Sequence, residues 1–165
     1  MALLLRGNSK CPICSNVIQQ EDDVTVFPHF ILNQADALFP LSDAACHSNC
    51  VNSDAVGRQM LVATRGYYAC TGPGKRICVV CENEVSDPDD YLLIGYLGRS
   101  TGDALGRFEY THLHRSHIHE WKQVDEFLSL AKKAINSDQW QGDALYNIIR
   151  EIEATRNVET KLQGR

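Results

Sequence analysis

The chain has 165 residues and a mass of 18.5 kDa, which is enough for one ordinary domain or two small ones. With 44% hydrophobic and 22% charged residues, its composition excludes a disordered tail, a collagen and a coiled coil. The net charge of −5 argues against binding to a nucleic-acid backbone as the main activity. The unusual feature is a set of seven cysteines together with six histidines.

The beginning of the sequence contains neither a membrane span nor a complete secretion signal. Its apolar run, residues 2–5, ends at Arg6, and no segment approaches the roughly 18 to 20 apolar residues that a span requires. We therefore expect a cytoplasmic protein without membrane contact. Because thiols stay reduced in that compartment, clustered cysteines favour metal ligation. A disulfide framework is the alternative, and the odd number of cysteines would leave one thiol unpaired in it.

The cysteines and histidines form four pairs, and each pair has a gap of two residues. In chain order the pairs are Cys11 and Cys14, His47 and Cys50, Cys78 and Cys81, and His114 and His117. Residues 15–46 separate the first pair from the second, and the equally long segment 82–113 separates the third from the fourth. The four positions of the first two pairs therefore recur in the last two pairs at an offset of 67 residues (78 − 11). This pattern indicates an internal repeat, from about 8 to 66 and from about 75 to 136.

The first repeat opens with Cys-Pro-Ile-Cys at 11–14, which is typical of a knuckle, a tight turn that brings two thiolates to one point. A strand is expected over 24–27, where branched and aromatic residues follow each other. A second short extended run then leads into His47. Because His47 and Cys50 are three residues apart, we expect both on one face of the first turn of a helix.

That helix is expected over 51–65. Gly57 lies inside it and weakens the prediction, while Gly66 is a plausible stop. The clearest breaker follows at 71–74, where Thr-Gly-Pro-Gly marks the boundary between the repeats.

The second repeat follows the same order. Cys-Val-Val-Cys at 78–81 predicts a knuckle, 91–97 a strand, and His114 and His117 the helix-borne ligands. The pattern then predicts one helix over 118–135, whose apolar side chains recur at helical spacing and are interpreted as core. These are Ile118, Trp121, Leu128, Ala131 and Ile135.

A last helix is expected after Asp143, which would cap it, and the tail is expected to fray from about Asn157. Its apolar face consists of Leu145, Ile148, Ile149 and Ile152. The predicted division is a first zinc repeat over 1–70, a second over 71–137, and a C-terminal helix and tail over 138–165.

Each repeat supplies a closed set of four ligands for one tetrahedral zinc ion, which leaves no position for a catalytic water. The simplest assignment is sequential: Cys11, Cys14, His47 and Cys50 bind one ion, and Cys78, Cys81, His114 and His117 bind the other. A cross-braced order would instead join the first pair to the third. Cys46 is an alternative to His47, but Leu113 occupies the matching place in the second repeat.

Knuckle, hairpin and helix-borne ligands together resemble a tandem of two treble-clef zinc fingers over about 8–136. This resemblance implies an α+β fold of two small zinc-stabilised domains followed by C-terminal helices. Cys-Pro-Ile-Cys and the run Cys46-His47-x2-Cys50 also resemble a RING finger, a family that serves ubiquitin ligases. In that family the residue at the position of Ile13 contacts the ubiquitin-conjugating enzyme. The sequence departs from a RING because the next Cys pair does not follow Cys50 immediately.

The remaining polar and sulfur-containing residues have simpler interpretations. Cys70 is expected to be a small buried hydrophobe. Acidic pairs at 22–23 and 89–90 are expected to be solvated turns. Three histidines outside the repeat register are expected at the surface or beside a ligand: His29, His112 and His119. A His-Asn-His nuclease is disfavoured, because neither half of the chain has a positive net charge.

The functional expectation is a zinc-binding protein-interaction module or adaptor without a catalytic site of its own. Its sharper form places it in a ubiquitin-like conjugation system, with Ile13 at the docking surface. The alternative is nucleic-acid binding through a local patch of Arg99, Arg107 and Arg115.

Overall fold

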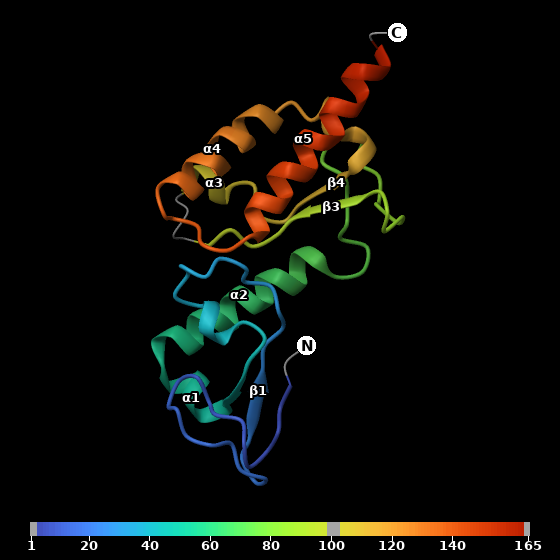
Figure 1. Ribbon diagram of the computed structural model, residues 1–165. Helices are drawn as coiled ribbons and strands as arrows, with labels where there is room; N and C mark the ends of the chain where they lie inside the picture. The colour runs from blue at the N-terminus through green and yellow to red at the C-terminus, as the bar shows by residue number, and fades with distance from the viewer. Residues whose placement is uncertain (1–2, 99–102, 164–165) are drawn as a thin grey trace.

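The computed structural model describes residues 3–98 and 103–163, which form an α+β structure of helices and small antiparallel sheets (Figure 1). Figure 1 shows two units along the chain, one in blue and green and one in yellow and red. Each unit pairs one two-stranded sheet with helices. None of the described helices is both long and apolar enough to cross a membrane.

The first unit has the strands β1 (Val24–Val26) and β2 (Ala45–His47), joined through a 3-10 turn η1 (Phe39–Leu41). Helices α1 (Ser48–Ser53) and α2 (Ala55–Thr71) follow directly. The single helix expected over 51–65 is therefore wrong in two respects: it is divided, and it continues past Gly66 to Thr71.

The division lies at Asp54, whose extended backbone (φ −86°, ψ 144°) separates α1 from α2. Its carboxylate accepts hydrogen bonds from the amides of Val56 and Gly57 at 2.8 and 3.1 Å. Asp54 is thus the N-cap of α2, and a cap of this kind stabilises a new helix start.

The second unit has the strands β3 (Tyr91–Ile94) and β4 (Thr111–His114), with the short helix α3 (Asp103–Gly106) between them. A 3-10 turn η3 (Arg115–Glu120) comes next, followed by α4 (Val124–Asn136) and α5 (Ala144–Gln163).

The expectation of one helix over 118–135 is wrong, because the backbone of Trp121 is extended (φ −71°, ψ 103°) and ends η3. The side chains of Ile118 and Trp121 are nevertheless buried in the core, as expected. Strand β3 is shorter than the expected 91–97, and α5 continues helically beyond Asn157, where fraying was expected.

The offset of 67 residues also describes the backbone. Ser15 (φ 63°) matches Glu82 (φ 60°), and Asp43 (φ 58°) matches Tyr110 (φ 56°), all in the left-handed region that L residues rarely adopt. The strand registers correspond as well, because the last residue of β2 and of β4 lies opposite the first residue of β1 and of β3.

Each unit has its own hydrophobic core, and the two units also contact each other. Ile31 forms a parallel bridge with Tyr96. The fully buried Asn33 donates to the carbonyl of Gln139 at 2.9 Å and accepts from the amide of Gln141 at 2.9 Å. A loop of the first unit is therefore hydrogen-bonded to the connection between α4 and α5.

Gly57 is required for the close approach of α2 to α1, whereas Gly66 is not tightly packed. A Cβ atom at position 57 would lie 2.6 Å from the carbonyl oxygen of Val51 and 2.8 Å from its Cα. A Cβ atom at position 66 would meet nothing within 4 Å. The two glycines of the same helix therefore have opposite roles.

We expect Gly57→Ala to lower the free energy of unfolding by about 1–3 kcal/mol, because backbone atoms must move to admit the methyl group. Gly66→Ala should raise it by about 0.5–1 kcal/mol, because alanine loses less backbone entropy in a helix. Urea unfolding of the two variants and the parent chain measures both effects. Equal destabilisation by the two substitutions would contradict this packing of α1 against α2.

Candidate metal centres

The first centre gathers four side chains from three elements. Cys11 and Cys14 come from the knuckle, His47 from the end of β2, and Cys50 from α1. One ligand atom of each lies within 4.8 Å of the others. His47 Nδ1 is 3.3 Å from Cys14 Sγ and 3.9 Å from Cys50 Sγ. Ligand atoms around tetrahedral zinc are roughly 3.3–3.8 Å apart, so this set fits such an ion.

The second centre has the same plan with one thiolate fewer. Cys78, Cys81, His114 and His117 also place their ligand atoms within 4.8 Å of one another. Cys81 Sγ lies 3.5 Å from His114 Nδ1, and Cys78 Sγ lies 3.8 Å from His117 Nδ1. The structure therefore brings the eight predicted residues together in the sequential order, and two Cys/His clusters could each bind a metal ion.

The knuckle backbone stabilises a thiolate at the first cysteine of each unit. Burial opposes the effect at Cys11, but backbone amides of Cys14, His47 and Ile13 lower its pKa to about 6. Burial also tends to raise the pKa of Cys78, but hydrogen bonds from the amides of His114 and Cys81 outweigh it and lower the pKa to about 6. Hydrogen bonds to a thiolate favour the charged form, which is the form that binds metal.

A carboxylate orients the histidine of the first centre. His47 turns Nδ1 toward the sulfur atoms, and its Nε2 lies 3.1 Å from Asp22 Oδ2, which also accepts the amide of Gln19 at 2.6 Å. The Gln19 amide and then His47 hold the pKa of Asp22 below its usual value. A carboxylate in this place fixes the ring and makes the imidazole a stronger metal ligand.

In the second centre the supporting carboxylate is Asp90, which lies one position after Asp89, the residue that matches Asp22 at the 67-residue offset. Asp90 accepts the backbone amide of Ser116 at 2.8 Å and its hydroxyl at 3.0 Å. These bonds fix the start of η3, which carries His117. The pKa of His117 is raised, first by its hydrogen bond with Cys78.

The interpretation of the acidic pairs as solvated turns is therefore incomplete, because Asp22 contacts a ligand and Asp90 holds the turn that carries one. Sequence reasoning did not identify either residue as part of a centre. The available signal was the strand pairing: Asp22 stands two residues before Val24, which lies directly opposite His47.

Cys46 lies outside the first centre. It is fully buried on β2, opposite Thr25, and Leu113 takes its place in the second unit. Burial and then the nearby Cys11 raise the pKa of Cys46 to about 12. Burial therefore disfavours a thiolate at Cys46, whereas His47 presents a ring nitrogen to the cluster.

The other cysteine and the three remaining histidines lie outside the two clusters. His112 is buried, accepts from the hydroxyl of Tyr91 at 2.8 Å, and donates to the carbonyl of Cys70 at 3.0 Å. Cys70 itself is half-buried, not buried as expected. His29 and His119 are exposed.

Ile13 is partly buried and packs against the first core beside the knuckle. The arginines considered for nucleic-acid binding are engaged elsewhere where the structure describes them: Arg107 pairs with Glu126 and Arg115 with Glu151. Arg99 lies outside the described residues.

The fold and the two clusters define the class: a small α+β protein with two Cys/His centres that could each hold a metal ion, and the donor sets are those of zinc. No family, curated protein or solved structure matches this chain in comparisons with known proteins. The residues and their geometry therefore carry the functional argument.

We expect Asp22→Asn to weaken zinc binding at the first centre by about 10- to 100-fold, because the imidazole loses its charged partner. Competition with a chromogenic chelator measures the change. Asp89→Asn is the matched control, since Asp89 occupies the same register position and is exposed. The role assigned to Asp22 would be contradicted if both substitutions weakened zinc binding equally, or if neither weakened it.

Zinc retention should fall as the pH drops below about 6. The pKa values of Cys11 and Cys78 are depressed to about 6, so these two thiolates are present above this pH, and protons compete with the metal for them below it. Chelator-detected zinc release across this range gives the midpoint. Cys70→Ser should leave the curve unchanged, and a midpoint well above pH 7 would argue against stabilised thiolates.

Proposed function

We propose that this chain is a zinc-binding protein-interaction module built from two treble-clef-like units. The single observation that carries the proposal is the pair of four-ligand clusters, in which every ligand is a cysteine or a histidine. Four protein ligands complete a tetrahedral zinc ion and leave no position for substrate or water, which is typical of structural centres. Binding of the ions then serves folding, and the folded surface serves recognition.

The arrangement of elements supports the treble-clef assignment. Each unit supplies a knuckle, a two-stranded antiparallel hairpin, and a helical turn that carries the last ligand. The equivalent left-handed residues at the knuckles support descent of both units from one duplicated segment.

Exposed apolar side chains beside the second knuckle support a protein partner. Ile77 and Val79 flank Cys78 and are 43% and 50% exposed. Apolar groups that a rigid turn holds in solvent are suited to burial against another protein. The ion pairs of Arg107 and Arg115 leave less positive charge for a nucleic acid.

Zinc analysis of two single variants tests the proposal. Cys14→Ser should lose the ion of the first unit and keep that of the second, and Cys81→Ser should do the reverse. Elemental analysis gives the stoichiometry, and amide spectra show which unit loses its structure. Loss of both ions in either variant would contradict two separate centres.

The finer form of the proposal is an adaptor role in a ubiquitin-like conjugation system, with the exposed part of Ile13 in contact with the conjugating enzyme. Pull-down of purified conjugating enzymes tests this role. Ile13→Ala should abolish capture, whereas Val80→Ala, the register-matched and partly buried residue of the second unit, should leave it intact. Unchanged capture by Ile13→Ala would remove this form of the proposal.

A further inference from the structure

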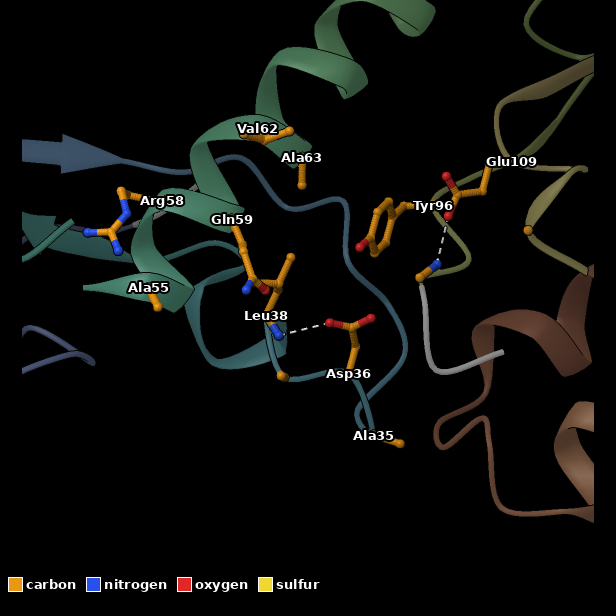
Figure 2. Close-up of a pocket in the computed structure, with 13 residues that line it drawn as sticks. Ala35, Asp36, Leu38, Ala55, Arg58, Gln59, Val62, Ala63, Tyr96 and Glu109 are labelled. Carbon is orange, nitrogen blue, oxygen red and sulfur yellow. Dashed lines mark hydrogen bonds between the residues drawn. The ribbon is translucent and has the colours of Figure 1, made fainter. Parts of the chain in front are cut away.

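A cavity of about 870 Å³ lies between the two units, away from both metal centres (Figure 2). One wall is α2, another is the loop at 35–38, and the third comes from the second unit through Tyr96, Gly98 and Glu109. Its volume is within the range of roughly 300–1,000 Å³ that is typical of ligand pockets. Six of the described lining residues are alanine or glycine, so a ligand backbone can approach the walls closely.

A buried carboxylate faces this cavity. Asp36 is 8% exposed, and its Oδ1 accepts the amide of Leu38 at 2.8 Å. Among the described residues, none donates a hydrogen bond to its Oδ2. Figure 2 shows the Asp36 carboxylate directed into the space between Leu38 and the ring of Tyr96.

Gly98 packs directly against that oxygen. Its backbone has φ +76°, and a Cβ atom there would lie 2.2 Å from Asp36 Oδ2. Any other residue would be strained in this conformation, and its side chain would collide with the carboxylate. The glycine therefore leaves room for the Asp36 carboxylate at the edge of the cavity.

The donors nearest to the carboxylate are already used. Glu109 accepts the amides of Leu97 and Gly98 at 3.0 and 2.8 Å. Arg58, on the α2 side of the cavity, donates through Nη1 to the carbonyls at positions 52 and 53, at 3.1 and 2.8 Å. A ligand group that binds Asp36 Oδ2 must therefore bring its own hydrogen-bond donor, and a positive charge strengthens that bond.

We propose that this cavity binds a lysine side chain of a partner polypeptide, with its ammonium group on Asp36 Oδ2. Lysine carries three donors and no acceptor, which matches the unfilled acceptor. Its methylene stem would lie along the alanines of the walls, and the Tyr96 ring adds a surface that attracts cations. The exposed Val62 at the rim offers contact to the flanking residues of the polypeptide.

This inference rests on the proposed interaction function and names the chemistry of the partner. A polypeptide is favoured over a free amine because the cavity is much larger than one ammonium group and has small residues on several sides. The overall charge of −5 also favours the approach of a basic segment.

The test is an amide-spectrum titration of the zinc-loaded full chain with two blocked tripeptides, acetyl-Ala-Lys-Ala-amide and acetyl-Ala-Gln-Ala-amide. The lysine peptide should shift the amides of Ala63 and Gly98, and the glutamine peptide should not. Asp36→Asn should weaken binding of the lysine peptide by about tenfold or more, because a charge-assisted hydrogen bond is lost. Asp125→Asn is the control, since it removes the same charge from an exposed position on α4.

Three results would overturn the inference: equal response to both peptides, unchanged affinity of Asp36→Asn, or binding of n-butylammonium chloride without binding of the lysine peptide. Zinc content is measured on the same sample. Two ions per chain with no lysine-dependent response overturn the cavity proposal alone, whereas absence of zinc overturns the proposed function on which it rests.

Discussion

The fold of this protein depends on the convergence of four cysteine and histidine side chains in each unit. In both units a knuckle brings two thiolates together, and a hairpin returns the chain so that two further ligands reach the same point. These contacts connect segments more than 30 residues apart, as the pairs Cys14–His47 and Cys81–His114 show. A hairpin of two short strands is marginal alone, and a metal ion bound by these four side chains would supply the stability that such a small unit lacks.

The two units differ in how much apolar packing supports this ligation. Among the described residues, the first core contains 11 buried hydrophobic residues and the second contains 19, because α4 and α5 contribute only to the second. Loss of zinc should therefore affect the first unit more severely. In the first unit a carboxylate also contacts a cluster residue directly, because Asp22 Oδ2 lies 3.1 Å from Nε2 of His47.

Much of this arrangement can be predicted from the sequence, because it depends on spacing. The offset of 67 residues aligns the ligand pairs, and the structure places those pairs together in the same sequential order. The helix breaks at Asp54 and Trp121 could not be predicted from apolar periodicity, since the apolar stripe continues in space across each bend. Detecting the break at Asp54 would have required recognising it as an N-cap.

Contacts between the units were equally inaccessible to spacing arguments. Asn33 hydrogen-bonds to backbone groups at 139 and 141, over a hundred residues away, and no motif in the sequence marks that pairing. The burial of Asp36 could not be predicted from spacing either. Asp36 matches Asp103 in the repeat register, but its burial beside Gly98 depends on how the two units meet. The site between the units therefore emerges only from the tertiary structure.

The central claim is that metal ions nucleate both units, and stepwise addition of zinc to the reduced, metal-free chain tests it most directly. Native mass spectrometry counts the bound ions while amide spectra follow folding. The account predicts that folded signals of both units grow with added zinc and saturate at two ions per chain. A metal-free chain that is already folded, with spectra unchanged by zinc, would contradict it.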